Sequence, residues 1–344
     1  MSFATRVGAA TLALAATTVG AHAQRLFRSD APIEITITTN IKKLVKDRDS
    51  TSLVKHGAMA SYVDSAGRTV AIPATLRARG HFRRQARNCD FPPIYFEPKN
   101  SAARGTLFSN VGRLKLTTNC QPGNAEYEQY ILQELLIYRA YATLTDSSYR
   151  TRLVHVTYRD SANAVKPIVT WAFFIEDPEL LAARLGGEHF KKTGAHFDDV
   201  EQDPLGRVGL FEFMIGNTDW SIAALHNITL VRDSAARLVT VPYDFDWSGA
   251  VNTRYAHPDA RFRTKSVTQR IYRGDCRDQA ALRPVVDRFL AKRSTIDGLF
   301  ASVPQLTSSK AKDMREYLDE FWDRATHLAV LARDVSDGCQ KNGN

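Results

Sequence analysis

Acidic and amide side chains gather in two neighbouring stretches of the sequence. The stretch "VPYDFDWSG" (241–249) places Asp244 and Asp246 one residue apart, and "GNTDWSIAALHN" before it supplies Asp219 and Asn227. On an extended strand the two aspartates share a face, and Mg²⁺ and Mn²⁺ prefer carboxylate oxygens as ligands. Turn formation would also explain Asp, Asn and Gly at these positions. The pair therefore indicates either a turn or a divalent-metal site.

Cationic side chains form a second pattern, in "LRARGHFRR" (76–84). If this stretch is a strand, every second residue lies on the same face. The residues on that face are Arg77, Arg79, His81 and Arg83. Such a face predicts an anion-binding site, and a solvated basic edge strand is the alternative.

A lone glutamate and a lone lysine lie in apolar surroundings. Glu134 is in the helical stretch "AEYEQYILQELLIYRAY", within a stripe of tyrosines and isoleucines, and Lys115 lies between two leucines in "GRLKLTT". A buried carboxylate is costly unless a cation meets it. We therefore expect an ion pair between Lys115 and Glu134. The alternative is that the Glu134 side chain is long enough to place its carboxylate at the edge of the apolar stripe.

The elements that must position these residues differ between the two halves of the chain. Residues 33–80 alternate in hydrophobicity as strands do, with a hairpin around 65–67, and a long helix is expected at 125–144. Beyond Pro178 helical patterns dominate, interrupted by a hairpin that leads into the aspartate pair, and 279–335 is helical. This order predicts an α+β protein with two lobes. The β-rich N-terminal lobe would span 24–178 and the mainly helical lobe 179–344.

Residues 1–23 have the pattern of a secretory leader. A basic start at Arg6 precedes the apolar "VGAATLALAATTVG", and "AHA" before Gln24 is a small-residue cleavage site. The apolar run is too short to span a bilayer. The sequence thus predicts a secreted or periplasmic protein with no transmembrane segment in the mature chain.

Cysteine usage and charge agree with export. The four cysteines match no zinc spacing, so two disulfides are expected, and we favour Cys89–Cys120 and Cys276–Cys339 because each pair stays within one half of the chain. The formal net charge of +9 favours anionic partners of the cell envelope. The sequence contains no nucleic-acid-binding motif, and we expect no nucleic-acid partner.

Taken together, the motifs follow the order of parts in a protein kinase. The chain resembles the CotH-type kinases, an atypical kinase-like family first met in spore-coat proteins. The resemblance covers about residues 76–249 and rests on "RARGHFRR", "GRLKL", "LQELL", "FFIED", "GNTDWS", "HN" and "PYDFDWSG". It implies a two-lobed protein-kinase-like fold that binds ATP with Mg²⁺ or Mn²⁺. It also implies phosphoryl transfer to an envelope protein or an anionic glycan.

The resemblance also implies roles for single residues. Lys115 would contact the phosphates, Glu134 would anchor Lys115, and Asp219 would be the catalytic base. Arg77 and Arg79 would lie over the phosphates. Glu176 would lie near the adenine in the segment that links the lobes. The metal ligands would be Asn227, Asp244 and Asp246.

Two other functions fit the same residues. Asp-Phe-Asp is also a metal motif of glycosyltransferases, but no early βαβ unit with a Gly-rich turn accompanies it here. The other alternative is a non-catalytic envelope scaffold, a degenerate kinase relative whose basic stretch binds polyanions.

Overall fold

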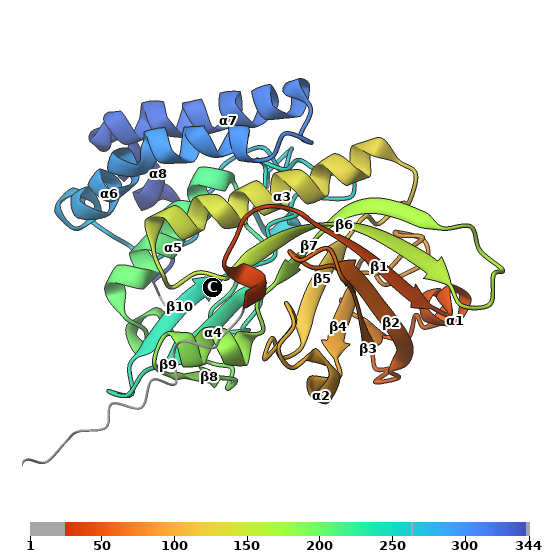
Figure 1. Ribbon diagram of the computed structural model, residues 1–344. Helices are drawn as coiled ribbons and strands as arrows, with labels where there is room; N and C mark the ends of the chain where they lie inside the picture. Colours follow the sequence, from red (N-terminus) through yellow and green to blue (C-terminus); the bar gives the residue numbers. More distant parts are fainter. Residues whose placement is uncertain (1–24, 263, 342–344) are drawn as a thin grey trace, which may run out of the picture.

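Seven strands close into a barrel in the order β1–β2–β3–β4–β5–β7–β6. The computed structural model describes residues 25–262 and 264–341 (Figure 1). β1 and β6 pair in parallel, from Ile33 opposite Val154 to Thr39 opposite Asp160, and the other neighbours pair antiparallel. The barrel strands are β1 (Ile33–Thr39), β2 (His56–Val63), β3 (Thr69–Ala78), β4 (Ile94–Pro98), β5 (Leu114–Thr118), β6 (Thr151–Asp160) and β7 (Ile168–Ile175).

The two-lobed, protein-kinase-like fold predicted from the sequence is wrong. The β-rich part is a closed barrel of mixed pairing, accompanied by helices and a separate three-stranded sheet in the order β10–β9–β8. These strands are β8 (Glu188–Phe190), β9 (Ile228–Arg232) and β10 (Leu238–Pro242). Hydrophobic alternation locates strands, but it carries no information about β1 pairing with β6, which lies far along the chain.

The long helix α3 (Ala125–Leu144) agrees with the helix expected at 125–144. It begins at Asn124, whose side-chain oxygen accepts a hydrogen bond of 3.1 Å from the backbone N–H of Glu126. α3 packs against β7 on one side and α6 on another, and it therefore lies between the barrel and the C-terminal helices (Figure 1). This position lets one helix present residues to both parts of the molecule.

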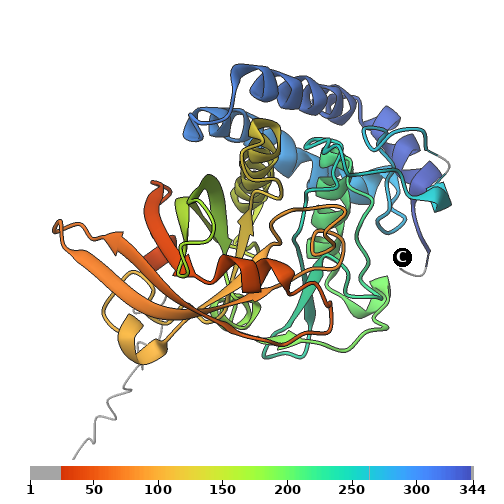
Figure 2. The same cartoon turned by 90° about the vertical axis from the view of Figure 1, so that its right-hand side faces the viewer.

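The remaining helices are short or lie in the C-terminal half. Figure 2 shows the C-terminal helices α6, α7 and α8 as a layer above the barrel and the second sheet. The bounds are α1 (Ile41–Lys46), α2 (Asn100–Ala103), α4 (Pro178–Arg184), α5 (Gln202–Ile215), α6 (Gln279–Gly298), α7 (Ser308–Thr326) and α8 (Leu328–Gly338). No helix in the described ranges is long and apolar enough to cross a membrane.

Buried apolar side chains form two clusters. One fills the barrel, and the other runs from α3 through α5 and the β9–β10 hairpin to the C-terminal helices. Two disulfides, Cys89–Cys120 and Cys276–Cys339, confirm the predicted pairing. The first fastens the loop after β3 to the residues after β5. The predicted leader, 1–23, lies outside the described residues.

The basic stretch is a strand only in part. β3 ends at Ala78, and Gly80 has a φ of 79°, a left-handed conformation that glycine adopts without strain. The expected alternation of four cations on one strand face therefore stops at Arg77. Arg79 and Arg83 extend from the loop that follows, and this loop carries them toward the end of β10.

Candidate functional site

Three carboxylates meet where α3 passes the end of the β9–β10 hairpin. One oxygen from each of Glu134, Asp244 and Asp246 lies within 4.8 Å of the other two, a spacing that could hold a metal ion. The exposed side-chain fraction is 30% for Asp244 and 6% for Asp246, and Glu134 is buried. We call these three residues the acidic triad. Because the hairpin supplies two members and α3 the third, distant parts of the sequence build the site together.

The two aspartates converge through a bend and not through an extended strand. β10 ends at Pro242, and Asp244 has a φ of 65°. The backbone N–H of Asp244 donates a hydrogen bond of 2.8 Å to the Tyr138 hydroxyl. A left-handed aspartate is held only where surrounding contacts fix it. The tyrosine from α3 therefore helps to fix the conformation that directs Asp244 toward Glu134.

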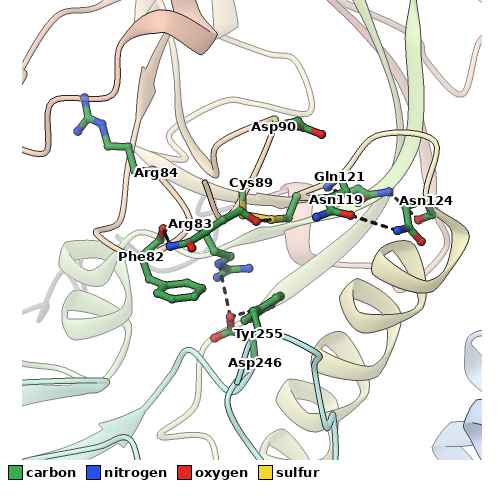
Figure 3. The surroundings of a disulfide bond; sticks show 12 residues. Phe82, Arg83, Arg84, Cys89, Asp90, Asn119, Gln121, Asn124, Asp246 and Tyr255 are labelled. Atoms are coloured by element: carbon green, nitrogen blue, oxygen red, sulfur yellow. Dashed lines mark hydrogen bonds and ion pairs between the residues drawn. A yellow bond between two sulfur atoms is a disulfide. The ribbon is translucent and has the colours of Figure 1, made fainter. Parts of the chain in front are cut away.

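Arg83 reaches into the acidic triad from the loop after β3. Its Nη2 lies 3.2 Å from Oδ1 of Asp244, and its Nε lies 3.4 Å from Oδ2 of Asp246. The Tyr255 hydroxyl donates a further hydrogen bond of 2.9 Å to Oδ2 of Asp246 (Figure 3). A single buried guanidinium thus balances part of the charge that three neighbouring carboxyl groups would carry.

Two members of the triad, Glu134 and Asp246, hold their protons more tightly than isolated carboxyl groups do. Burial raises the pKa of Glu134 well above its usual value, and Asp246 and Asp244 raise it further. Burial also raises the pKa of Asp246 to about 6. For Asp244, burial acts in the same direction, but Arg83, Arg79 and Lys115 outweigh it and lower the pKa. Oε1 of Glu134 is buried and has no hydrogen-bond partner among the described residues.

A row of cationic and aromatic side chains crosses the barrel next to the triad. The strand register places Arg77 opposite Tyr95 and Tyr95 opposite Lys115, so the three share one face. The Arg77 guanidinium lies 5.0 Å from the centre of the Tyr95 ring. Arg79 donates a hydrogen bond of 3.0 Å from Nη2 to the Thr117 hydroxyl, and its buried Nε has no partner.

The predicted ion pair between Lys115 and Glu134 does not form. Nζ of Lys115 lies 3.7 Å from the centre of the Tyr243 ring, a cation–π contact. The charges that act most on Glu134 are those of Asp246, Arg83, Asp244 and Arg79. The prediction failed because the loop after β3 brings arginines to the glutamate. Burial and then Arg79 lower the pKa of Lys115 from 10.5 to about 7, while Asp244 acts in the opposite direction.

Asp219 lies at the centre of a second polar group. Its Oδ1 lies 2.9 Å from Nε2 of His226, and its Oδ2 accepts a hydrogen bond of 3.2 Å from Nδ2 of Asn227. The hydrogen bond to Asp219 raises the pKa of His226. Asn227 therefore orients Asp219 through its amide nitrogen. In the acidic triad, the group that joins Asp244 and Asp246 is Glu134, which the resemblance gave the role of anchoring Lys115.

Glu176 contacts an arginine of α4, and its place near the adenine stays a prediction. This buried carboxylate lies at the end of the β7 segment and pairs with Arg184 of α4, with Nη2 at 2.8 Å from Oε2 and Nε at 3.1 Å from Oε1. Both of its oxygens are therefore engaged in holding α4.

Three residues of the site were not assigned a role from the sequence. In the sequence, Arg83 is one of four cations on a predicted strand face, and His226 is the neighbour of Asn227. Tyr255 had no signal at all, because a tyrosine in a loop is uninformative until the fold brings it to Asp246. Arg83 alone could have been found, by asking which cation neutralises the aspartate pair.

Comparison with protein-family models finds none that matches this chain, and comparison with curated proteins finds no match either. The resemblance to CotH-type kinases therefore rests on the short motifs alone and stays a prediction.

Proposed function

We propose that the protein binds ATP together with Mg²⁺ or Mn²⁺ at the acidic triad. The observation that carries the proposal is the meeting of three carboxylates with Lys115 and the buried Arg79, neither of which forms an ion pair with a carboxylate in the described part of the chain. Glu134, Asp244 and Asp246 supply oxygen ligands for a divalent ion, and Lys115 and Arg79 supply positive charge beside it. Mg²⁺ binds through one or two carboxylates and the oxygens of a phosphate. The carboxylates would therefore hold the metal ion, and the cations would contact the phosphates.

Phosphoryl transfer is the reaction that we propose for this site. An acceptor hydroxyl would attack the terminal phosphorus of ATP, and the bond from that phosphorus to ADP would break as the new one forms. Asp219 would accept the proton of the hydroxyl, with His226 and Asn227 holding it in place. An exported protein would find its acceptor in an envelope protein or an anionic glycan.

The test compares the triad with an acid elsewhere on the surface. Asp244→Asn and Asp246→Asn should each weaken Mn²⁺-dependent ATP binding, measured by calorimetry, by more than the roughly 10–100-fold typical of outer-shell partners of a metal. Asp287→Asn, an exposed change on α6, is the matched control and should bind as the unaltered protein does. Asp219→Asn should retain binding and abolish transfer.

Three outcomes would contradict the proposal. ATP binding that survives both triad substitutions would rule out the metal site. Tight, selective binding of a sugar nucleotide in place of ATP would favour a glycosyltransferase. Failure to bind either nucleotide would favour the non-catalytic scaffold.

A further inference from the structure

A polar pocket lies on the barrel and shares no residue with the acidic triad. It has a volume of about 760 Å³ and lies among the start of β1, the β2–β3 hairpin and the turn after α2. Four arginines line it, namely Arg25, Arg68, Arg104 and Arg152. Because they come from four separate segments, the fold concentrates positive charge that no stretch of the sequence shows. We call this cavity the arginine pocket.

Three of these arginines have no carboxylate partner in an ion pair within the described part of the chain. Arg25 donates a hydrogen bond of 2.9 Å from Nη1 to the carbonyl of Gly105, and Arg152 donates one of 3.1 Å to the carbonyl of Leu26. Arg104 is exposed at the end of α2. Carbonyl oxygens orient a guanidinium but do not neutralise it, so the positive charge remains available to a ligand.

The acids near the pocket contact side chains other than Arg25 and Arg104. Asp64 lies 2.8 Å from Arg68, and Glu34 lies 2.9 Å from His155. Asp30 raises the pKa of Arg152, and its Oδ1 lies 3.8 Å from Nη2 of Arg139. None of these carboxylates therefore cancels the charge of Arg25 or Arg104.

Arg152 distinguishes the pocket from a chance cluster of surface charges, because the fold holds this arginine in a buried position. Only 7% of this residue is exposed, and its buried Nε has no hydrogen-bond partner. Burial lowers its pKa, because a charged guanidinium is costly away from water. Because Arg152 lines the cavity and no carboxylate forms an ion pair with it in the described residues, an anion in the cavity would stabilise its charge.

We propose that the arginine pocket binds a phosphoryl group carried by a small molecule or a lipid headgroup. A carboxylate has two oxygens and satisfies one arginine fork, whereas a phosphoryl group offers more acceptor oxygens and more charge to several arginines. The cavity exceeds the size of a phosphate, and Val63 and Val70 give it an apolar wall for the carbon part of the ligand. Val63 is 64% exposed, so this wall is open to solvent.

The test uses three probes without divalent metal: inorganic phosphate, glycerol phosphate, and phosphatidylcholine vesicles with or without phosphatidylglycerol. The double substitution Arg25→Gln with Arg104→Gln changes two exposed residues and should preserve the fold. It should weaken binding of the best probe at least about tenfold, because both substitutions remove charged hydrogen-bond donors that the phosphoryl oxygens would use. Arg283→Gln removes one exposed charge from α6 and is the matched control, which should change binding less than about twofold.

The probes separate the two sources of the phosphoryl group. Arginine-dependent binding of glycerol phosphate in solution assigns the pocket to a soluble ligand, and binding only to vesicles with phosphatidylglycerol assigns it to a lipid. Arg152→Gln, in whatever fraction folds, should also lose the probe and should keep Mn²⁺-dependent ATP binding. If no probe binds saturably, or if Arg283→Gln loses as much affinity as the double variant, the proposal is overturned.

Discussion

At the scale of single residues, Arg83 is the most informative. Its guanidinium lies within 3.4 Å of both aspartates of the acidic triad. It thus places a positive charge beside the carboxylates to which a metal ion would bind. A divalent ion must therefore compete with a cation that the protein carries itself. Arg83→Gln should tighten Mn²⁺ binding about tenfold or more, although breaking a buried pair costs about 3–5 kcal/mol of unfolding free energy without metal.

Calorimetry and thermal unfolding check this prediction. Arg87→Gln is the control, because it removes an exposed charge from the same loop. Added Mn²⁺ should restore stability to the Arg83 variant more than to the control. Unchanged or weaker metal binding by Arg83→Gln would show that the guanidinium supports the site and does not compete for it.

Lys115 gives a second prediction at this scale, through its pKa of about 7 in the absence of ligand. The unfolded chain binds this proton up to the ordinary value of 10.5, so between about pH 7 and 10.5 the unfolded state binds more protons. Lys115 therefore makes the unfolding free energy rise with pH in this window. Bound phosphate favours the charged lysine, so ATP binding near pH 8.5 should take up close to one proton.

Calorimetry in buffers of different ionisation heat measures the proton uptake. Lys115→Met should abolish the uptake and flatten the rise of stability with pH, whereas Lys99→Met, at an exposed position, should change neither. Near pH 6 the unaltered protein should take up no proton at this residue, because Lys115 is already charged. Equal proton uptake by both variants would show that Lys115 does not bind the phosphates of ATP.

At the scale of elements, the loop after β3 depends on its anchors. The disulfide Cys89–Cys120 ties it to the end of the β5 segment, and Arg84 pairs with Asp47 at 2.9 Å. The same loop carries Arg83 into the triad. Replacing Cys89 and Cys120 by Ala should lower the unfolding free energy by about 2–4 kcal/mol and also weaken ATP binding.

The second disulfide is the matched control for this prediction. Cys276–Cys339 joins the segment before α6 to the end of α8, away from the triad. Its removal should cost similar stability and leave ATP affinity unchanged when both are measured well below the unfolding temperature. A similar loss of affinity in both variants would show that general destabilisation, and not the anchoring of this loop, weakens ATP binding.

Elements with a local signature could be predicted, and those that depend on distant partners could not. The helix at 125–144, the two hairpins and both disulfides were visible in periodicity, turn residues and cysteine spacing. The strand predicted in the basic stretch is too long, because one glycine with a left-handed φ ends the alternation. At the site, the aspartate pair is visible in the sequence, but the predicted ion pair between Lys115 and Glu134 does not form, and Lys115 lies over the Tyr243 ring.

At the scale of the whole molecule, the acidic triad and its cations span two apolar clusters. Arg83 and Lys115 come from the barrel part, whereas Asp244 and Asp246 come from the hairpin packed in the other cluster. α3 supplies Glu134 between them. No pattern within either half of the sequence could have revealed this arrangement, because it depends on how the two clusters meet.

The parallel pairing of β1 with β6 sets an order of events during synthesis. β2 can cover one edge of β1 almost at once, but β6 covers the other edge only after residues 40–150 have been made. At roughly 5–20 residues per second this wait lasts on the order of ten seconds. For that time the first strand offers unpaired backbone groups to any neighbouring chain, so the nascent protein is most vulnerable to aggregation before its sixth strand is made.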